Sequence, residues 1–566
     1  MNTSPTAPAA AIAPSVGGFR YVRHAARTPT LSGGIELGRH PVLIAGGGPV
    51  GMALALGLAN HGVRSVLLEA DDTVCVGSRA ICVSRRSLQL MERLGALPGF
   101  LSKGLPWSVG RSFYKTDEVF RFEMPADPRK TLPPMVNLAQ YDIEQFLLDE
   151  IERRNAVQPG VIDFRWGTEV TALAQDAETV ALTVRNADSE YRLQGLWLAA
   201  CDGGQSFVRK ALGLALGGEA YEGRYLIIDI ELASDHPTER RAWFDPPWHR
   251  GATVLMHRQP DDIWRIDYQL RADQHTEDAL QPHAIAEFVQ RHLDAIGEGH
   301  LPWKTVWTSV YRAGAMTLAG YRHGHILFAG NAAHALPIFG VRGLNSGFDD
   351  ADNLAWKLAY VIKQQAGDAL LDSYSQERIA AFRINAESAM RSTEFMSPPS
   401  RGFELLREAA LSLAGQHTGL AQLVNPRQTE AVRYAGSTLS SDGDLLDAGP
   451  LAGEAMPGFA LEDGHLAQGE AGTFMLWIFA PEGSPDPATE VDIAHARDAV
   501  GIAIPLTTRR VYGADARLLA ALGAKDGAAY LLRPDGHVAA RWRRVNAATL
   551  ADALRRAVAA CEEIHA

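Results

Sequence analysis

The chain has 566 residues, of which 46% are hydrophobic, 21% are charged and 8% are aromatic, and its formal net charge is −12. A chain of this length exceeds a single hydrophobic core, so two or three domains are expected. The acidic balance and the lack of a long basic run argue against nucleic acid as a partner.

The cysteines and the apolar segments bear on the cellular compartment. Cys75, Cys82, Cys201 and Cys561 show no CxxC or metal-ligand spacing, so we expect buried thiols in a reducing compartment and no metal site. No apolar run reaches the roughly 18 residues that a transmembrane helix needs. Prolines interrupt the early segment APAAAIAPSV, and no basic residue precedes it, unlike a secretory signal. We therefore expect a cytoplasmic protein without membrane contact.

Regular structure is expected to begin near residue 41. Residues 1–40 are rich in Ala, Pro, Ser, Thr and Gly, which predicts a tail that is mobile or laid over the surface. Residues 42–45 then predict a buried strand, 46–51 a GxGxxG turn, 52–61 a helix and 65–69 a second strand. This succession is the βαβ fingerprint of dinucleotide binding.

The glycines of the fingerprint have separate tasks. Gly46 permits the tight turn, Gly48 lets the backbone approach a pyrophosphate, and Gly51 lets the helix pack closely on the strand. The start of the helix, with Pro49 and Val50, offers free N–H groups and a partial positive charge to the phosphates. These residues are the first candidate cofactor-binding residues.

Glu69 ends the second strand and is placed to accept hydrogen bonds from the hydroxyls of an adenosine ribose. The same carboxylate disfavours a ribose 2′-phosphate, so the site suits FAD or NAD and not NADP. A glycine-rich turn alone could arise by chance. The two strands, the helix and the terminal acid together favour nucleotide binding.

Later segments place polar residues where apolar elements begin or end. Arg79 follows the βαβ unit, and Gln140 opens an amphipathic helix. Asp202 ends an apolar strand as part of an Asp-Gly pair, and a helix bearing Arg209 follows it. A further buried strand meets a turn of small residues around Asn331.

These motifs, in this order over residues 41–400, resemble the class A flavoprotein monooxygenases, the aromatic hydroxylases related to para-hydroxybenzoate hydroxylase. The nearest subgroup is that of the phenol and 3-(3-hydroxyphenyl)propionate hydroxylase-like enzymes. The resemblance implies FAD in the fingerprint, with Arg79 approaching its phosphates and Gln140 near its ribityl chain. It also implies that Asp202 belongs to the DG motif, which serves both flavin and pyridine nucleotide.

The segment GNAAHALPIFGVRGLN, residues 330–345, is called the GD segment below. It resembles the family's GD motif, in which an acid binds the ribityl hydroxyls. Asn331 stands where that acid is expected. Charged hydrogen bonds contribute about 1.5–3 kcal/mol and neutral ones about 0.5–1.5 kcal/mol, so FAD should be held about 1 kcal/mol less tightly. The resemblance also implies that the backbone from Pro337 to Asn345, including Gly343 and Leu344, cradles the isoalloxazine ring.

The glycines of this segment are expected to let a flat ring reach the backbone. A Cβ at Gly340, Gly343 or Gly347 would hold the ring away. A surface loop that caps a helix is the alternative interpretation. His334 follows two alanines and is expected to be a structural hydrogen-bonding residue, not a catalytic base.

Within residues 218–320, the segments YLIIDIEL and IWRIDYQL alternate apolar and polar residues, as half-buried antiparallel strands do. We expect them to form a sheet over the flavin, with the substrate between. Tyr225, His257, Arg265 and Tyr268 are candidates to line that pocket. Each is more simply explained as ordinary sheet surface, so no catalytic residue is assigned.

The expected fold is α/β: a Rossmann-like FAD-binding domain with an inserted antiparallel substrate sheet, followed by a thioredoxin-like α/β domain. The C-terminal unit lacks CxxC, which excludes thiol redox chemistry and leaves packing or the support of a homodimer. The expected boundaries are 1–40 for the tail, 41–217 and 321–400 for the FAD-binding domain, 218–320 for the sheet domain, 401–435 for a helical linker and 436–566 for the thioredoxin-like domain.

The resemblance implies a reaction. NADH or NADPH reduces FAD, O₂ adds at the flavin C4a, and the hydroperoxide hydroxylates a phenolic or related aromatic substrate. The sequence contains no second dinucleotide fingerprint, so the nicotinamide cofactor is expected to bind transiently. Two alternatives stay open: another FAD-dependent oxidoreductase of the same superfamily, and a non-enzymatic binding protein on the same fold.

Overall fold

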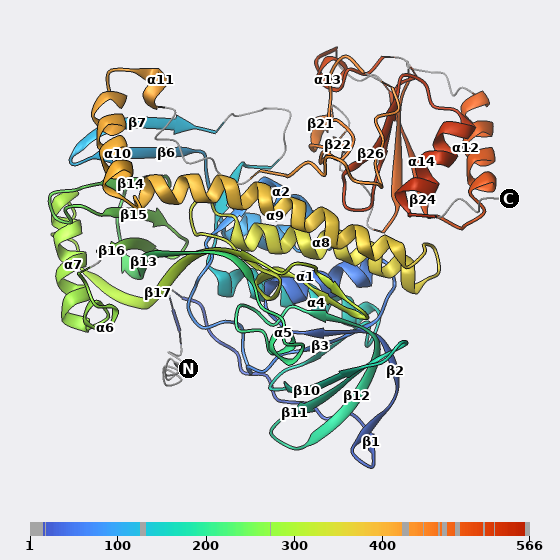
Figure 1. Ribbon diagram of the computed structural model, residues 1–566, viewed down its shortest axis with the longest axis horizontal. Coiled ribbons are helices and arrows are strands. Elements are labelled where there is room, and N and C mark those ends of the chain that lie inside the picture. Colours follow the sequence, from blue (N-terminus) through green and yellow to red (C-terminus); the bar gives the residue numbers. More distant parts are fainter. Residues whose placement is uncertain are drawn as a thin grey trace.

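A computed structural model describes residues 15–560, except for residues 17, 125–131, 272, 422–429, 445, 462–463, 467–471, 481–486, 513–515 and 526. The beginning of the predicted tail, residues 1–14, and Cys561 lie outside the described residues. Two large sheets and a smaller C-terminal sheet are joined by long helices (Figure 1).

Parallel strands form the centre of the first sheet, whose order is β10-β11-β12-β2-β3-β9, with β19 parallel to β12. Its strands are β1 (Leu31–Ser32), β2 (Ile35–Ala45), β3 (Ser65–Leu68), β9 (Ile162–Arg165), β10 (Glu169–Gln175), β11 (Val180–Arg185), β12 (Glu190–Ala200), β18 (Arg322–His323) and β19 (Ile326–Phe328). Parallel strands end at one edge of a sheet. Gly46, Glu69, Asp202 and Asn331, which follow β2, β3, β12 and β19, therefore meet at one edge.

The first sheet begins inside the segment predicted as a tail. β2 starts at Ile35, and Phe19 is already buried in the main core, in ring contact with Tyr21 and Tyr141. The predicted boundary at residue 40 is therefore wrong. The first residues of β2 are mostly exposed, Leu37 by 71%, so no run of buried apolar residues marks the start of the strand.

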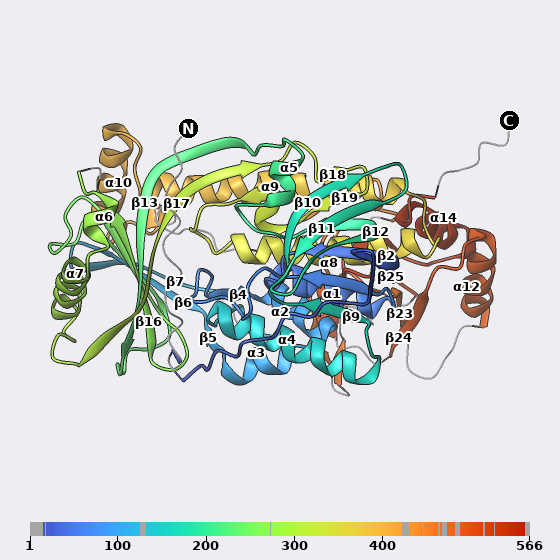
Figure 2. The ribbon, with the colours of Figure 1, turned by 90° about the horizontal axis from the view of Figure 1, so that it is seen from below.

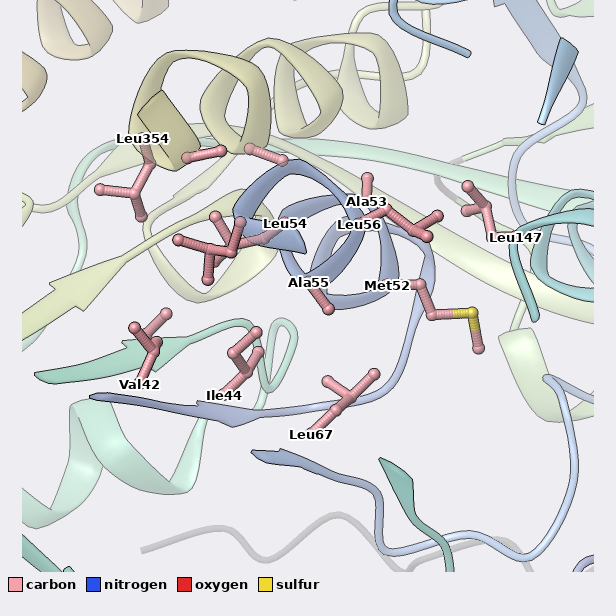
Figure 3. Close-up of a cluster of buried hydrophobic side chains, with 14 of the residues drawn as sticks. Val42, Ile44, Met52, Ala53, Leu54, Ala55, Leu56, Leu67, Leu147 and Leu354 are labelled. Carbon is pink, nitrogen blue, oxygen red and sulfur yellow. The ribbon is translucent and has the colours of Figure 1, made fainter. Parts of the chain in front are cut away.

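Helix α1 (Pro49–Asn60) is enclosed on all sides, and every residue from Gly51 to Leu58 is buried. Figure 3 shows its side chains between the strand residues Val42, Ile44 and Leu67 and the helix residues Leu147 and Leu354. A helix packed on all sides needs no polar face. Helices α2 (Arg85–Leu94), α4 (Gln140–Val157) and α8 (Gly343–Ile362) contact α1. Helix α3 (Leu97–Lys103) packs on α2 and α4, and the short α5 (Phe207–Ala211) packs on β10. A small sheet contains β4 (Cys82–Ser84), β5 (Leu105–Trp107) and β8 (Met135–Asn137).

The second sheet has the order β20-β17-β13-β16-β15-β14-β6-β7. Its strands are β6 (Val109–Tyr114), β7 (Asp117–Glu123), β13 (Gly217–Leu232), β14 (Arg240–Phe244), β15 (Thr253–Arg258), β16 (Ile263–Leu270), β17 (Trp303–Thr317) and β20 (His334–Ala335). The inserted segment predicted from 218–320 supplies most of it. β6 and β7 come from the part assigned to the FAD-binding domain, and β20 comes from the GD segment, so these assignments are corrected.

The two faces of the second sheet have different partners. Leu226, Ile228 and Ile230 face outward and form a core with Phe288 of α7 (Pro282–Ala295). The short α6 (Thr276–Ala279) precedes α7. Residues of the opposite parity, such as Tyr225, face inward toward Phe339 of the GD segment. The inner face thus points at the edge where the first-sheet motifs meet.

The long helix α9 (Ala369–Met396) runs beside α8, and its end reaches the second sheet, as Figure 1 shows. In the segment predicted as a helical linker, α10 (Arg401–Ala414) and α11 (Thr418–Ala421) are helical, while residues 422–429 are outside the described part. α10 packs on the second sheet through Leu411 and Ala414.

The C-terminal unit has a sheet of order β24-β23-β25-β26, in which β23 and β24 are parallel and the other pairs antiparallel. Its elements are β21 (Phe459–Leu461), β22 (Gly464–Leu466), β23 (Phe474–Ala480), α12 (Pro487–Val500), β24 (Leu506–Tyr512), α13 (Ala516–Leu522), β25 (Ala529–Leu532), β26 (Val538–Trp542) and α14 (Ala547–Ala557). Trp356 and Tyr360 of α8 belong to the same apolar core as this sheet. The unit is thus packed against helix α8.

A buried ionic network fixes the β25–β26 hairpin to α8 and α9. Glu377 of α9 accepts from Lys357 of α8 at 2.7 Å and from Arg533 of the hairpin at 2.6 Å. Asp535 of the hairpin accepts from Trp356 Nε1 at 3.1 Å, and its carbonyl accepts from Arg86 at 2.7 Å. These groups are almost fully enclosed, so the network has no access to water that could replace a lost partner.

Candidate functional site

The glycine turn after β2 has the geometry of an anion site. Gly46 has φ of +101°, and a Cβ there would lie 2.4 Å from the carbonyl oxygen of Cys201. A Cβ at Gly51 would lie 2.0 Å from the carbonyl of Gly46, so the close packing predicted for these glycines is confirmed. Gly48 differs, because a Cβ there would meet nothing within 4 Å. The turn is therefore closed toward the protein at Gly46 and open at Gly48, beside the start of α1.

Glu69 lies directly beside this turn. Its Oε2 accepts from the Gly47 N–H at 2.7 Å, and its Oε1 accepts from the Asp71 N–H at 3.0 Å. Burial raises the pKa of the Glu69 carboxyl. Both oxygens retain lone pairs that can accept from a ribose. The structure thus brings Glu69 and the turn together as the fingerprint predicts.

Gln140 is hydrogen-bonded to the loop that carries Arg79. The Gln140 N–H donates to Ser78 Oγ at 2.9 Å, and the Ala80 N–H donates to Gln140 Oε1 at 3.3 Å. The carbonyl of Arg79 accepts from Arg265 of the second sheet at 3.0 Å, while the Arg79 side chain is exposed. The second sheet therefore holds this loop in place.

Arg209 of α5, the helix that follows Asp202, links this helix to the backbone at Asn331. Arg209 donates to the carbonyls of Ala332 at 2.9 Å and Asn331 at 3.4 Å. Asp202 Oδ2 accepts from the Val208 N–H at 3.0 Å, but its Oδ1 is buried without a hydrogen-bond partner among the described residues. Asn331 is exposed, and its amide makes no hydrogen bond in the described part of the chain. Both side chains therefore have unused hydrogen-bonding capacity at the sheet edge.

The segment from Pro337 to Asn345 runs from β20 of the second sheet into the first turn of α8. Pro337 is buried, Leu344 is half-buried against the main core, and a Cβ at Gly343 would meet nothing within 4 Å. Asn345 accepts from the Ser84 N–H at 2.9 Å and donates to the carbonyl of Cys82 at 3.1 Å. The Asn345 side chain thus anchors the start of α8 to the residues before α2.

Gly347 serves packing instead of an approach to a ring. A Cβ at Gly347 would lie 2.7 Å from Val50 Cγ2 and 3.5 Å from the Cα of Gly330. The expectation that Gly347 makes room for the flavin is therefore wrong. The glycine lets α8 lie against the start of α1, which brings the two helix N-termini close together. Gly343 stays open, as the cradle requires.

Asp350 of α8 organises the GD segment, and the sequence analysis missed it. It is fully buried and accepts from the Gly330 N–H at 2.9 Å, from His334 Nε2 at 2.7 Å and from Arg378 at 2.6 Å. Burial opposes its ionisation, but His334 and Arg378 together lower the pKa of Asp350. His334 is thereby confirmed as a structural hydrogen-bonding residue. A signal existed, because Asp350 falls on the apolar face of α8 three residues after Gly347, where an acid must find a partner.

The inner face of the second sheet carries three of the four pocket candidates. Tyr225, His257 and Arg265 face the first-sheet motifs, and Tyr225 donates or accepts a hydrogen bond with Ser397 at 2.5 Å. Tyr268 points the other way and lies between the rings of His249 and Phe288. Tyr268 is therefore excluded from the pocket. Tyr268 pairs with Leu226 and so lies on the face that α7 covers, which the sequence of β16 alone does not indicate.

Two further observations concern metal-binding clusters and membrane-spanning helices. Within the described ranges, no group of three or more His, Cys, Asp or Glu side chains could hold a metal ion. No helix in the described part of the chain is both long and apolar enough to cross a membrane.

Residues 39–389 match the family model described as the FAD binding domain. The chain belongs to this family. Its cofactor is FAD, and the observed site fits it: Gly48 and Gly343 leave open space, Asp202 Oδ1 lacks a partner, and two helix N-termini converge. The FAD-binding fold is Rossmann-like, as the sequence predicted.

Relatives in this family are named as hydroxylases. The chain is 30% identical over 374 residues to 3-(3-hydroxy-phenyl)propionate/3-hydroxycinnamic acid hydroxylase of Mycolicibacterium smegmatis, covering 65% of this chain and 63% of that protein. It is 26% identical over 429 residues to the Escherichia coli K12 protein of the same name, covering 75% of each. The chain thus spans less than two thirds of the length of the M. smegmatis relative.

Two solved structures share the fold over nearly the whole chain. The flavin-dependent monooxygenase PieE, in complex with FAD and substrate, superposes with a TM-score of 0.76 at 22% identity, covering 92% of this chain and 99% of that one. Aklavinone-11 hydroxylase, in a ternary complex with FAD and aklavinone, gives 0.73 at 22% identity, covering 92% and 100%. At this identity the likeness establishes the fold.

Proposed function

We propose that this protein is an FAD-dependent monooxygenase, which uses NADH or NADPH and O₂ to hydroxylate a phenolic or related aromatic compound. The observation that carries the proposal is the position of the glycine-rich segment, which runs from the first sheet into the second through β20. A flavin cradled by this segment would lie under the inner face of the second sheet. The names of the relatives support the same activity.

The residues of the chain have separate tasks in this proposal. Gly48 and the start of α1 bind the pyrophosphate, Glu69 binds the ribose, and Arg79 approaches the phosphates. The ribityl chain lies along Gln140, Asp202 and Asn331. These assignments rest on the shared sheet edge and on the open side of the turn described above. When bound, FAD supplies the redox chemistry and the activation of O₂.

The second sheet would keep water away from the reacting atoms. Its inner face presents apolar side chains toward the GD segment, among them Tyr225, Leu255 and Phe244, packed with Phe339. Such a dry surface protects a reactive oxygen species from hydrolysis and holds a flat substrate by apolar contact. The protein's part is therefore positioning and exclusion of water.

We infer that the C-terminal unit is a thioredoxin-like domain used for packing. The support is its strand order, in which the parallel pair β23 and β24 is joined by α12 and followed by the antiparallel β25 and β26. Its apolar core is shared with α8. The unit supports the helix whose first turn carries Gly343, Leu344 and Asn345.

The reaction is tested by isotope incorporation. The FAD-loaded protein should oxidise NADH or NADPH slowly alone, and a phenolic substrate should accelerate the oxidation and consume O₂. Mass spectrometry should find one ¹⁸O atom from labelled O₂ in the aromatic product. If no compound in a broad panel of phenols gains the label, a flavin dehydrogenase should replace this proposal.

Asn331→Asp tests the ribityl assignment. The charged acceptor should tighten FAD by about 1 kcal/mol, or about fivefold in Kd, because charged hydrogen bonds are stronger than neutral ones. Equilibrium titration of the apoprotein with FAD measures the difference. Asn331→Leu, which removes the acceptor, serves as the opposite control and should weaken binding. Equal affinities in all three proteins would contradict the assignment.

A further inference from the structure

A segment near the N-terminus, residues 19–28, is held against the protein at both ends, and we call it the N-terminal strap. The side chain of Phe19 is buried in the main core and contacts the ring of Tyr141, with 4.7 Å between ring centroids. At the other end, Thr28 Oγ1 accepts a hydrogen bond from Asn186 at 2.9 Å. The strap lies before residue 39, where the match to the family model begins. The match to the family therefore gives the strap no task.

Between its two ends, the strap contacts two loops that lie next to Glu69. The first loop follows β3: the His24 N–H donates to the carbonyl of Asp72 at 2.7 Å, and Arg23 forms an ion pair with Asp72 at 2.7 Å. The second loop joins β9 to β10: the ring of His24 stacks on that of Trp166, with 4.6 Å between centroids and 13° between planes. His24 thus contacts both loops at once.

The stack of rings continues from the strap to the glycine turn. Trp166 stacks on Phe164, with 4.1 Å between ring centroids. The Phe164 ring lies against the turn, because a Cβ at Gly47 would be only 2.9 Å from it. Aromatic rings in contact have preferred geometries. His24 therefore supports, from the outer end of the stack, the ring that packs on the turn.

The two loops also determine where the Glu69 carboxylate lies. The Thr168 N–H donates to the Glu69 carbonyl at 2.7 Å, and the Gly167 N–H donates to the Asp71 carbonyl at 2.9 Å. The Asp71 N–H in turn donates to Glu69 Oε1 at 3.0 Å. These bonds tie Glu69 and its neighbours to the second loop. A strap that fastens both loops therefore also fixes the orientation of the carboxylate.

We propose that the N-terminal strap is a clamp for the adenosine half of FAD, with His24 as a positioning residue that acts through Glu69. The inference rests on the proposed function, which assigns Glu69 to the ribose. For the loop after β3 to move away from the turn, His24 must give up its contacts with Asp72 and Trp166. The clamp therefore slows the release of FAD. Arg23 adds little, because Arg23 and Asp72 are 64% and 38% exposed and an exposed ion pair is weak.

His24→Ala tests the stack in the full-length, FAD-loaded protein. The variant keeps the backbone bond to Asp72 and loses only the ring, so FAD should be released about fivefold faster, as expected for one pair of stacked rings. Samples taken at intervals after dilution are desalted, and the flavin absorbance that stays with the protein gives the rate. His283→Ala is the matched control. His283 is an exposed histidine of α7, beyond the outer face of the second sheet, so this variant should release FAD at the wild-type rate.

A reversible lock on the strap should give the opposite change. A Cβ at Gly167 would lie 3.4 Å from the Cβ of Ala26, close to the separation of about 3.5–4.5 Å in a disulfide. In the double variant Ala26→Cys, Gly167→Cys, oxidation should slow FAD release about tenfold or more, because the bond prevents the strap from detaching.

The reduced form of the double variant is the control for the lock, since it carries the same strain at Gly167, whose φ is +57°. Oxidised and reduced wild type, measured in parallel, show any effect of the native cysteines. A disulfide that fails to form would contradict the contact between the strap and the second loop.

Several outcomes overturn the inference. Wild-type release rates in both His24→Ala and the locked protein would show that the strap does not retain FAD. A lower Tm of the His24→Ala apoprotein with unchanged release would leave the strap a structural role only. In a Glu69→Gln protein, His24→Ala should change the rate little further, and a full additional effect would contradict action through Glu69.

The isotope experiment separates this inference from the proposed function. Labelled product from a protein whose FAD release does not depend on the strap would refute the clamp alone. Strap-dependent release without labelled product from any phenol would refute the hydroxylation alone.

Discussion

Glu377→Ala is expected to lower the free energy of unfolding by about 3–5 kcal/mol, the range for breaking one side of a buried ion pair. Glu377 accepts from Lys357 at 2.7 Å, from Arg533 at 2.6 Å and from Asn353 at 2.8 Å, all in the interior. Without it, Lys357 loses its one ion-pair partner among the described residues, Arg533 keeps only Asp535, and water cannot enter to replace the lost carboxylate. Urea unfolding followed by circular dichroism measures the loss.

Glu387→Ala on the same helix is the matched control. Glu387 also forms an ion pair, with Arg391 at 2.5 Å, but the side chains are 65% and 76% exposed. An exposed pair contributes about 0–1 kcal/mol, so this variant should unfold close to the wild type. If the two variants unfold at the same urea concentration, the network is not what fixes the hairpin. Limited proteolysis should also release the C-terminal unit sooner in Glu377→Ala.

Gly48→Ala is expected to weaken FAD binding about 100-fold without harming the fold. The backbone at Gly48 has φ of −71°, which alanine adopts freely, and a Cβ there would meet nothing within 4 Å. Any effect must therefore come from the space that the pyrophosphate occupies. Displacing the phosphates would cost one or two charged hydrogen bonds of about 1.5–3 kcal/mol each. Flavin titration and the melting temperature of the apoprotein give the two quantities.

Gly46→Ala is the contrasting variant two residues away. Its φ of +101° disfavours alanine, and the new Cβ would lie 2.4 Å from the Cys201 carbonyl. This variant should lose both apoprotein stability and FAD binding. A Gly48→Ala protein that binds FAD as the wild type does would mean that the phosphates lie elsewhere. A Gly48→Ala protein that melts early would show that this position supports the fold.

Local patterns were sufficient where one segment defines its own environment. Gly46 and Glu69 are held in one βαβ unit, so their spacing along the chain sets their spacing in the fold. The C-terminal unit, predicted over residues 436–566, likewise consists of elements that are short apolar or amphipathic runs, from β23 (Phe474–Ala480) to α14 (Ala547–Ala557). The boundary at residue 40 failed because the first residues of β2 are exposed.

Contacts between distant segments could not be predicted. Asp350 and Arg378 meet because α8 and α9 lie side by side. Neither helix has a sequence pattern that indicates the other as its partner. The assignment of β6 and β7 to the second sheet depends on a parallel pairing with β14, for which a single strand carries no signal. The sequence grouped Tyr225 with Tyr268 as candidates for one pocket, yet the register of β13 on β16 puts them on opposite faces of the sheet, and α7 covers the face of Tyr268.

The sequence by itself determined the Rossmann-like fold and a dinucleotide fingerprint that suits FAD or NAD, because a glycine turn between a strand and a helix is a local structure with local requirements. The resemblance of its motifs to a known family then indicated FAD. The tertiary structure alone decided which charges are satisfied. Arg240 and Arg265 look alike along the chain, but Arg265 meets Asp229 and Arg240 meets no acceptor among the described residues. Pairing is a property of packed neighbours, which the sequence of one segment does not specify.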